Sequence, residues 1–350
     1  MASSNRKVGA LIGAGMVAGT HVAACADAGK SLRLKGILSK GKESAQSLAA
    51  IASEKTTEPV VAFESIEQIA SDPEIDFAIV ATPPNVRCDI IEPLVKAGKH
   101  ILLEKPIGRT LMEAQDIVKM CKDSEIILGV VFQHRVRLAS IKASSMVKTG
   151  ELGALGLAEF NIPWWREQSY YDEPGRGTYA RDGGGVLISQ AIHSIDLGLS
   201  LTGPVSSVIA MAKTSNFHKM ESEDFVVAGL QFANGAAGSM VASTASFPGK
   251  PESITLHFER ASLHLEAGEL QVTWRDGTID TYGEESSTGG GADPMAFTHA
   301  WHQEVIENFV ANLNGEQIPY VSGEDALAAH NLIDATMRSA DNGTVQNLNL

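Results

Sequence analysis

A glycine-rich turn, Gly13-Ala14-Gly15-Met16-Val17-Ala18, constrains the fold of this chain more than any other feature. It follows a short apolar run, residues 8–12, that has the pattern of a strand buried on both faces. It opens an alanine-rich segment, residues 16–28, that is expected to be a helix. A tight turn alone could need the same glycines, but between a first strand and a first helix they match the G-x-G-x-x-A fingerprint. The sequence therefore predicts a dinucleotide site in which Gly13, Gly15, Met16 and Val17 surround the pyrophosphate at a helix N-terminus.

Strand and helix patterns alternate along the first 133 residues. Apolar runs predict strands, and the segments between them, two of which are closed by glycine, predict helices. Strands that alternate with helices of this length indicate a doubly wound, parallel Rossmann sheet with right-handed crossovers. The expected strands are 8–12, 32–38, 77–81, 100–103 and 126–132, and the expected helices are 16–28, 42–53, 90–97 and 111–122.

The pattern changes after Phe132. Successive alternating strands with turn signals predict a large, mostly antiparallel sheet, so the second part is expected to be an α+β domain. With roughly 150 residues per domain, 350 residues divide into a Rossmann domain, 1–133, and a substrate-binding and oligomerisation domain, 134–350. Glu284–Pro294, with three consecutive glycines, is expected to be a flexible loop. The expected strands here are 157–165, 205–212, 224–232, 236–246, 253–259, 261–266 and 269–273, and the expected helices are 138–149, 184–201, 296–313 and 323–339.

The charge balance excludes two classes of partner. The chain carries 28 Lys and Arg against 42 Asp and Glu, a formal net charge of −14. This argues against a nucleic-acid surface or a polybasic membrane patch, but not against a small anionic ligand. The apolar run near the N-terminus is broken by glycines, and no segment approaches the roughly 18 apolar residues of a membrane helix. Three cysteines without a CxxC pair indicate a reducing compartment, so we expect a cytoplasmic protein.

The end of the second strand bears on the choice between the nicotinamide cofactors. A carboxylate at this position binds the ribose 2′-hydroxyl and repels a 2′-phosphate. Here the strand ends without an acid: Ser39 offers a hydroxyl, and Lys40 and Lys42 offer positive charge. This favours NADP slightly. The alternative is that the lysines are solvated residues and that NAD binds through Ser39 alone.

A lysine follows the fourth expected strand in the sequence Glu104-Lys105-Pro106. Ligands of doubly wound sheets bind beyond the carboxyl ends of the strands, so Lys105 is expected near the nicotinamide. An ammonium group that is partly buried beside a cationic ring is suited to exchange a proton with a substrate hydroxyl. The alternative is a surface ion pair between Lys105 and a neighbouring acid.

These residues resemble the glucose–fructose oxidoreductase, inositol dehydrogenase and rhizopine-catabolism family, Gfo/Idh/MocA. The resemblance spans nearly the whole chain. It rests on the glycine-rich turn and on four further sequences: Ala81-Thr82-Pro83-Pro84-Asn85, Ala97-Gly98-Lys99-His100-Ile101-Leu102-Leu103-Glu104-Lys105-Pro106, Gly183-Gly184-Gly185 and His193-Ser194-Ile195-Asp196.

The resemblance implies an NAD(P)-dependent oxidoreductase with an open-faced second sheet that forms homodimers or homotetramers. It implies that Lys105 and His193 flank the substrate. The cofactor contacts expected from it are Thr82, Pro83, Asn85, Glu104, Lys105 and Gln133. The sequence departs from the family in two places: Ser189 stands where an Asp is frequent, and Arg87 stands where a His is frequent. Ser189 and Gln190 can orient a hydroxyl, but neither accepts a proton at neutral pH.

Aromatic residues gather in one loop of a chain in which only 6% of residues are aromatic. Rings that stack on a pyranose, with arginines as hydrogen-bond donors, would form a carbohydrate site. The alternative is a hydrophobic clamp that packs the loop onto its domain. The stretch is similar to the branch of the family that oxidises UDP-linked N-acetylglucosaminuronate, and a carboxylate-bearing sugar would suit the arginines. The expected substrate contacts are Trp164, Trp165, Arg166, Tyr170, Arg176, Ser189, Gln190 and His193.

His193 lies on an expected helix with Asp196 three residues later on the same face. A lone histidine there is more often structural, but the resemblance favours a site residue. Structural roles are expected for His21, His134, His299 and His302, and no grouping has the spacing of a metal site, so none is predicted.

The sequence thus predicts hydride transfer between a CH–OH carbon of a sugar, sugar acid or cyclitol and NAD(P). Lys105 is the expected general acid/base, and His193 is expected to bind the reacting oxygen. Two alternatives are an NAD-retaining glycoside hydrolase or lyase and a non-catalytic nicotinamide sensor.

Overall fold

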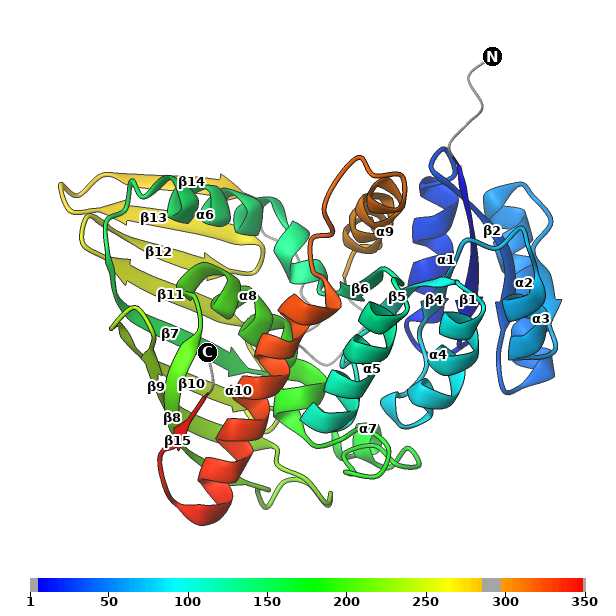
Figure 1. The fold of residues 1–350 in the computed structure, drawn as a ribbon. Helices are drawn as coiled ribbons and strands as arrows, with labels where there is room; N and C mark the ends of the chain where they lie inside the picture. The colour runs from blue at the N-terminus through cyan, green and yellow to red at the C-terminus, as the bar shows by residue number, and fades with distance from the viewer. Residues whose placement is uncertain (1–5, 285–296, 349–350) are drawn as a thin grey trace. The chain divides into compact units, whose positions relative to one another are not determined.

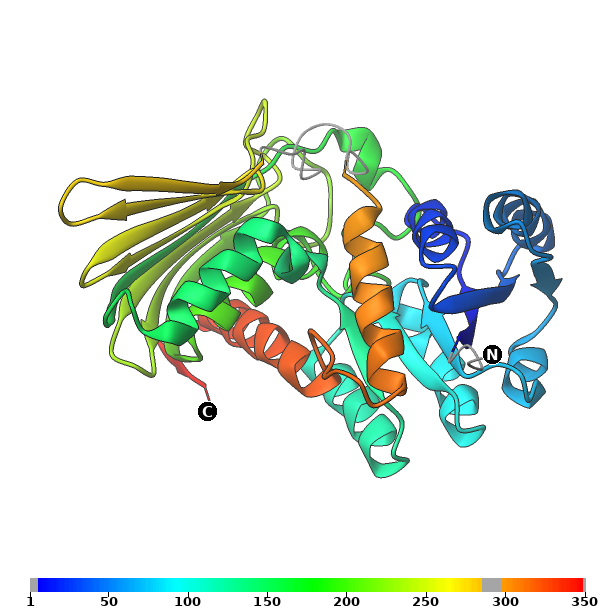
Figure 2. The same ribbon diagram turned by 90° about the horizontal axis from the view of Figure 1, so that it is seen from above.

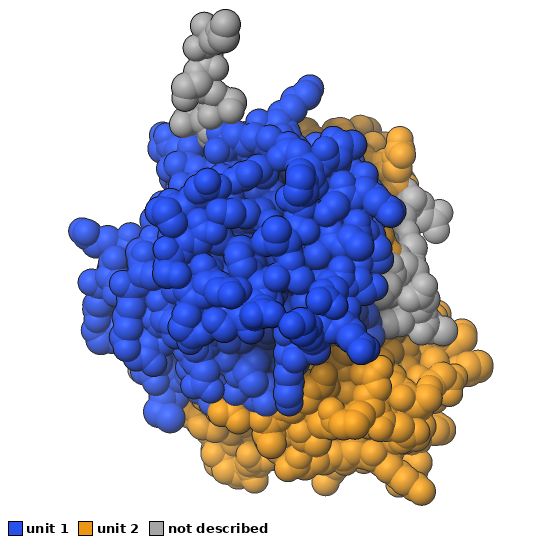
Figure 3. All heavy atoms as spheres, turned by 90° about the vertical axis from the view of Figure 1, so that its right-hand side faces the viewer, with its two compact units in different colours: residues 1–108, 112–133, 298–326 blue, residues 109–111, 134–297, 327–350 orange. Residues whose placement is uncertain are grey.

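A computed structural model of the protein describes residues 6–284 and 297–348, which form two compact units (Figures 1 and 3). The first unit comprises residues 1–108, 112–133 and 298–326, and the second comprises 109–111, 134–297 and 327–350. The chain passes from the first unit to the second after Gln133, and residues 298–326 return to the first unit. The division into domains 1–133 and 134–350 stays a prediction. The expected loop 284–294 lies, apart from Glu284, outside the described residues.

The first unit is built on a six-stranded parallel sheet with the strand order β3-β2-β1-β4-β5-β6. The central strands are apolar and buried on both faces, as expected for a sheet covered by helices on each side. This confirms the predicted doubly wound Rossmann fold. The strands are β1 (Lys7–Ile12), β2 (Leu32–Leu38), β3 (Val61–Phe63), β4 (Phe77–Val80), β5 (His100–Glu104) and β6 (Leu128–Val131).

Helices cover both faces of this sheet, with α1 and α9 on one face and α4 and α5 on the other (Figure 2). α9 comes from late in the chain and packs against β4 and β6: the ring of Phe309 lies 5.5 Å from that of Phe77, and a side chain at Gly129 would collide with it. The helices are α1 (Ala18–Asp27), α2 (Lys42–Thr56), α3 (Ile66–Ser71), α4 (Arg87–Lys96), α5 (Leu111–Asp123) and α9 (Ala300–Leu313), with a short 3₁₀ turn, η1 (Pro84–Val86), before α4.

The second unit contains a nine-stranded sheet with the order β14-β13-β12-β11-β7-β10-β9-β8-β15. Every neighbouring pair is antiparallel except β7 and β10, which confirms the predicted mostly antiparallel sheet. The strands are β7 (Leu155–Pro163), β8 (Val205–Lys213), β9 (Phe225–Phe232), β10 (Ala237–Ser243), β11 (Ser253–Phe258), β12 (Ala261–Glu266), β13 (Glu269–Trp274), β14 (Ile279–Gly283) and β15 (Gln346–Asn347).

Helices pack on one face of this sheet (Figure 2), and buried residues alternate with exposed ones along its strands. Phe160 faces the helices and lies directly against Gly198, where a side chain would collide with the ring. The opposite face carries Leu157, Ile209 and Met211, which are 40 to 51% exposed. The helical segments are η2 (Gln133–Val136), α6 (Leu138–Thr149), α7 (Gln168–Tyr171), the π-helix η3 (Leu187–Ala191), α8 (Ile192–Thr202) and α10 (Gly323–Asn342).

Cys25, Cys88 and Cys121, all within the described residues, form no disulfide bond. Cys25 and Cys121 are buried, and burial raises the pKa of each thiol to about 12, so both behave as small apolar side chains. Cys88 is exposed. Among the described residues, no helix combines the length and the hydropathy needed to cross a bilayer.

Candidate active site

The glycine-rich turn between β1 and α1 has the geometry that its sequence predicts. Gly13 has φ +115°, and a side chain there would lie 2.7 Å from the carbonyl oxygen of Ala81, so only glycine fits. Gly15 faces open space within 4 Å of its Cβ position, and Met16 is exposed beside it. Ala18 is buried at the start of α1. The turn therefore leaves room for an anionic group at the helix N-terminus.

The residues expected to distinguish NAD from NADP differ in their surroundings. Ser39 is half-buried directly after β2, and Lys40 is exposed. Lys42 donates to Glu64 at 2.8 Å, and this hydrogen bond raises the pKa of the lysine. Among the described residues Lys40 makes no ion pair, which leaves its ammonium group available for a ligand.

The ends of β4 and β5 bring the next predicted residues to one edge of the sheet. Pro83 and Asn85 are exposed, whereas Thr82 and Lys105 are half-buried. The Thr82 hydroxyl oxygen is buried and, within the described chain, makes no hydrogen bond. The Gln133 side-chain oxygen, after β6, is in the same situation. Buried polar atoms without protein partners fit a site where a cofactor supplies the hydrogen bonds.

A buried arginine links the two turns of this edge. The Arg87 guanidinium on α4 donates from Nε and Nη2 to the carbonyl oxygen of Thr82, at 3.1 and 2.7 Å. Nη2 also lies 3.4 Å from the carbonyl oxygen of Lys105. Burial lowers the pKa of Arg87 to about 10, opposed by the nearby Glu104 carboxylate, so the side chain stays a cation at neutral pH.

Glu104, which was expected to contact the nicotinamide half of the cofactor, is engaged by two histidines. Its Oε1 accepts a hydrogen bond from Nε2 of His21 at 2.8 Å and lies 3.5 Å from Nε2 of His302. All three side chains are buried. Burial alone would raise the pKa of the Glu104 carboxyl, but the two imidazoles outweigh it and hold that pKa well below its ordinary value. A contact between Glu104 and a cofactor stays a prediction.

In the second unit, the glycines at 183–185 bring the chain close to its neighbours before the helix of His193. A side chain on Gly183 would collide with the backbone of Arg109, and one on Gly185 would collide with the carbonyl group of Glu223. The buried Glu223 carboxylate accepts hydrogen bonds from the backbone N–H groups of Gly185 and Leu187 at 3.1 and 3.2 Å. Burial raises the pKa of this carboxyl despite those bonds. Glu223 therefore satisfies N–H groups at the start of the helical segment.

The helical segment that carries His193 begins with a π-helical turn. Ser189 and Gln190 lie in this turn, η3, and His193 is the second residue of α8. π-turns inside helices are frequent at functional sites, because they re-aim side chains from the regular α-helical spacing. Gln190 is buried, and its Nε2 lies 3.4 Å from the Tyr170 hydroxyl, which connects the turn to the aromatic loop.

His193 is buried and stacks on His134, with ring centroids 4.8 Å apart and an interplanar angle of 22°. Asp196, on the same helix, forms a bidentate ion pair with Arg135, with both distances 2.7 Å. The carboxylate that the sequence places near His193 is thus already bound by an arginine.

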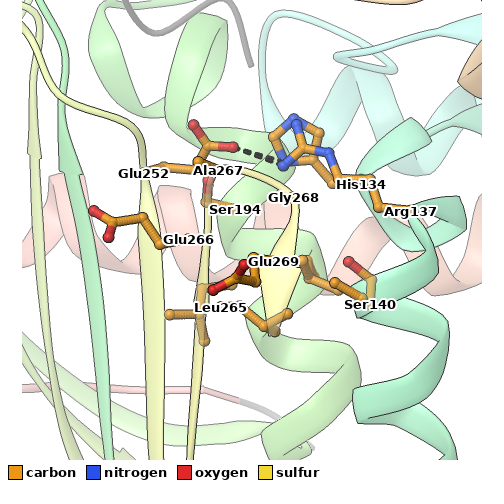
Figure 4. A pocket seen from close by; sticks show the side chains of 13 residues that line it. His134, Arg137, Ser140, Ser194, Glu252, Leu265, Glu266, Ala267, Gly268 and Glu269 are labelled. Carbon is orange, nitrogen blue, oxygen red and sulfur yellow. Dashed lines mark hydrogen bonds and ion pairs between the residues drawn. The ribbon is translucent and has the colours of Figure 1, made fainter. Parts of the chain in front are cut away.

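A buried carboxylate, Glu252, lies next to His134 and Arg137 (Figure 4). It accepts hydrogen bonds from Nη1 of Arg137 at 2.8 Å and from the Trp164 indole N–H at 3.3 Å, and Nδ1 of His134 is 3.8 Å away. Beside these groups is a cavity of about 20 Å³ that Ser194 also lines, enough room for one water molecule. This polar cluster supports the ring that stacks on His193.

The aromatic loop forms a stack of arginines and rings. The Arg166 guanidinium lies 5.2 Å from the centroid of the Trp164 ring and 5.8 Å from that of the Tyr170 ring. The Arg176 guanidinium lies 4.9 Å from the same Tyr170 ring centroid. Such cation–π contacts orient the guanidinium planes. Trp164 and Arg166 are buried, whereas Tyr170 is half-buried. The loop therefore has the interior packing of a clamp, and Tyr170 is the member of this stack with an accessible ring.

Trp165 lies in a separate aromatic group. Its ring is 5.4 Å from Phe247, 6.1 Å from Phe217 and 5.6 Å from His218. Phe247 and Phe217 are 75% and 68% exposed, so this group is at the surface of the second unit. A sugar contact by Trp164 or Trp165 stays a prediction.

The sequence did not point to His21, His302, His134 or Glu252 as members of the site. The first two contact Glu104, and the other two support His193. These contacts join segments that are far apart in the sequence, so the periodicity of the sequence does not indicate them. The one available signal was the position of Glu104 next to Lys105, which brings any partner of that carboxylate close to the lysine.

Several known proteins are similar to this chain over most or part of its length. Levoglucosan dehydrogenase of Pseudarthrobacter phenanthrenivorans is 27% identical over 259 residues, 65% of each chain. Myo-inositol 2-dehydrogenase of Thermotoga maritima is 23% identical over 276 residues, which cover 77% of this chain and 78% of the relative. The uncharacterized oxidoreductase C115.03 of Schizosaccharomyces pombe is 26% identical over 171 residues, 47% of this chain and 45% of the relative. The chain thus spans less than two thirds of the first and third of these relatives.

Solved structures share the whole fold. The WlbA dehydrogenase from Bordetella pertussis, in complex with NADH and UDP-GlcNAcA, is 27% identical with a TM-score of 0.81, and the match covers 99% of this chain and 100% of that chain. A levoglucosan dehydrogenase structure with NADH and levoglucosan has a TM-score of 0.84 at 22% identity, over 98% of this chain and 99% of that chain, and shows a similar fold.

Two family models match the chain, one in each unit. The model of the oxidoreductase family with an NAD-binding Rossmann fold matches residues 8–132, and the model of the GFO/IDH/MocA C-terminal domain matches residues 141–264. Together they cover more than half of the residues, and so the chain belongs to the GFO/IDH/MocA family of oxidoreductases.

Proposed function

We propose that the protein is an NAD(P)-dependent dehydrogenase of a sugar, sugar acid or cyclitol, which moves a hydride between a CH–OH carbon and the nicotinamide. The observation that carries this proposal is the carboxyl edge of the parallel sheet. β1, β4 and β5 are neighbours, so Gly13, Thr82 and Lys105, which follow their ends, lie along one edge. Ligands of open parallel sheets bind at this edge.

The residues of the first unit fit the cofactor. The open space at Gly15 would take the pyrophosphate, and the unsatisfied oxygens of Thr82 and Gln133 would accept hydrogen bonds from the nicotinamide half. The bound cofactor supplies the hydride chemistry, while the protein supplies position and charge. NADP is proposed over NAD by a small margin, because Lys40 is exposed near the end of β2 and no acid stands there.

Lys105 and His193 have separate roles in this proposal. Lys105 accepts the hydroxyl proton during oxidation and returns it during reduction, and His193 donates a hydrogen bond to the same oxygen. The half-buried position of Lys105 at the sheet edge supports the first role. The stacking of His193 on His134, next to a π-turn, supports the second, because it fixes the ring orientation.

The substrate proposed for the aromatic loop is a carbohydrate that carries a carboxylate. Tyr170 has an accessible ring for stacking, and Arg176 lies against it with a donor-rich edge. The similar WlbA dehydrogenase is bound to UDP-GlcNAcA, which has both a sugar and an acid group.

The same proposal includes a homo-oligomer in the cytoplasm. Leu157, Ile209 and Met211 give the open face of the second sheet exposed apolar surface, which suits a dimer or tetramer interface. The lack of a disulfide bond among the described cysteines suits a reducing compartment. Light scattering of the wild type and of an Ile209→Glu variant tests the interface, since a buried charge there would dissociate the oligomer.

One experiment tests the enzymatic proposal. Purified protein is incubated with polyols, sugar acids and nucleotide sugars, with NAD or NADP, and NAD(P)H absorbance is followed. Turnover of at least one carbohydrate supports the proposal, and its loss in a Lys105→Met variant that still binds cofactor supports the role of Lys105. Cofactor that remains bound through purification, with substrate cleavage but no net absorbance change, would instead indicate a hydrolase or lyase. Tight cofactor binding without turnover would indicate a sensor.

A further inference from the structure

Glu104 is the centre of a buried group of charged and polar side chains from three helices and one strand. Around it are His21 on α1, His302 on α9 and Arg87 on α4, and Glu104 itself is the last residue of β5. None of these side chains is more than 8% exposed. The residue that follows Glu104 is Lys105.

The two histidines converge on one oxygen of Glu104. Their Nε2 atoms lie 2.8 and 3.5 Å from Oε1, and their rings meet edge to face with centroids 5.1 Å apart. Burial lowers the pKa of His302, and the positive charge of Lys105 acts in the same direction. His302 is therefore neutral at neutral pH, and Lys105 is within electrostatic reach of the group.

Arg87 fixes the same segment through the backbone. Its donors bind the carbonyl oxygen of Thr82 and, at 3.4 Å, that of Lys105. α1 and α9 lie on one face of the sheet and α4 on the other (Figure 2). The segment is thus held on one face by contacts to the Glu104 side chain and on the other by contacts to the Lys105 carbonyl oxygen.

A metal ion is an alternative explanation for this cluster, because the potential ligand atoms of His21, Glu104 and His302 all lie within 4.8 Å of one another. The surrounding charges oppose it. Arg87 and Lys105 already bring two positive charges to one buried carboxylate, and a divalent ion would add two more in a medium of low dielectric.

We propose that His21, His302 and Arg87 are positioning residues for Lys105: the imidazoles fix the Glu104 carboxylate, and the guanidinium fixes the backbone carbonyl of Lys105. The proposal rests on the proposed function, in which Lys105 transfers the proton. Without these contacts the Glu104–Lys105 segment is free to shift, and a proton-transfer group displaced from its place loses rate while the cofactor still binds at the glycine-rich turn.

The test compares His302→Leu, which removes the donor, with His302→Gln, which keeps an N–H donor. The Leu variant is expected to lower kcat about tenfold, the effect of losing one hydrogen bond to a charged group. The Gln variant should recover most of this rate, and cofactor KM should change little in either. Arg87→Met and Arg87→Lys test the contact on the opposite face of the sheet in the same way. Arg87→Lys is expected to recover less of kcat than His302→Gln, because lysine lacks the two-pronged donor geometry of the guanidinium.

A second measurement needs no substrate. The rate at which acetic anhydride labels Lys105, relative to the exposed Lys30, is followed by mass spectrometry in the apo protein. Release of the segment in His302→Leu should change this ratio about three- to tenfold, and His302→Gln should not change it. Absence of wild-type turnover would overturn the proposed function only, since the labelling ratio still reports on the position of Lys105.

Three results would overturn the positioning role. The first is an unchanged kcat and labelling ratio in folded His302→Leu and Arg87→Met. The second is a lower melting temperature as the sole change, which would show a structural role. The third is one equivalent of zinc in wild-type protein that is lost in His302→Leu, which would assign a metal site.

Discussion

His134 and His193 stack face to face, with ring centroids 4.8 Å apart and both side chains buried. His134 is followed at once by Arg135, which binds Asp196 on the helix of His193. Two consecutive residues thus hold one turn of α8, and behind them Glu252 binds Arg137. The orientation of His193 therefore depends on residues that do not themselves need to touch a substrate.

Replacing His134 tests this dependence. We expect His134→Ala to lower kcat/KM for the carbohydrate about tenfold, because an aromatic pair contributes roughly 1 kcal/mol and an unsupported ring loses its orientation. His134→Phe keeps the stack and should lose less activity. Steady-state kinetics at saturating cofactor measures both, and equal losses in the two variants would contradict a stacking role.

Gly185 is predicted to be intolerant of any side chain. A Cβ atom there would collide with the carbonyl group of Glu223, whose carboxylate also binds the start of the helical segment. Gly185→Ala should therefore destabilise the protein by about 3 kcal/mol or prevent folding. Gly156→Ala is the matched control, because a Cβ atom there meets its nearest neighbour at 3.7 Å. Thermal unfolding of the two variants measures the difference, and similar melting temperatures would refute the explanation.

The sequence predicted long elements with clear signals and missed short ones. Both ends of α6 were predicted correctly, because Gly150 adopts a left-handed conformation directly after it. β3 and α3 were missed: β3 has three residues, one of them exposed, and α3 has six, too few for a periodic pattern. The helix expected at residue 184 begins at Leu187 with a π-turn, because Gly183 and Gly184 have φ of +86° and +152°, which a right-handed helix does not allow.

The sheet edge at which the candidate site residues lie could be predicted from the sequence, whereas their roles stay predictions. Lys105 and the glycine-rich turn follow strand ends, and the order of a doubly wound sheet brings strand ends together. The contact between His21 and His302 depends on the return of α9 to the first unit, which the alternation of strands and helices does not encode. His21 and His302 were therefore each predicted to be structural, without their shared contact with Glu104.

The buried group around Glu104 is expected to make the free energy of unfolding fall as the pH is lowered. The pKa of His302 is lowered in the folded protein, chiefly by burial, from an ordinary value of 6.5. Below that value the unfolded chain binds a proton that the folded protein refuses, so stability is lost with falling pH. The lowered pKa of Glu104 acts in the same direction at more acidic pH, since the unfolded carboxyl is protonated first.

Unfolding measured at pH 7.5, 6.5 and 5.5 checks this sign. The wild type should lose about 1 kcal/mol more than His302→Gln between the two extremes, because one proton per molecule is linked to unfolding. The other charged groups near this ring, His21, Glu104 and Lys105, are the same in both proteins, so the difference isolates His302. A variant with an equal or steeper loss on acidification would contradict the assignment.

Lys40 and Lys42 are expected to differ in how strongly each binds the 2′-phosphate of NADP. The Lys42 ammonium group is paired with the Glu64 carboxylate at 2.8 Å, whereas Lys40 is exposed after the end of β2 and makes no ion pair with the described residues. If NADP is the cofactor, Lys40→Ala should raise KM for NADP about tenfold, since a charge-assisted contact with phosphate is lost, and leave KM for NAD unchanged. Lys42→Ala is the matched control, and we expect a smaller effect on KM for NADP, because Glu64 competes with the phosphate for this ammonium group. Equal effects of the two substitutions on KM for NADP would show a general attraction of the anion to a positive surface. A strong wild-type preference for NAD would instead show that Ser39 binds the ribose without help from either lysine.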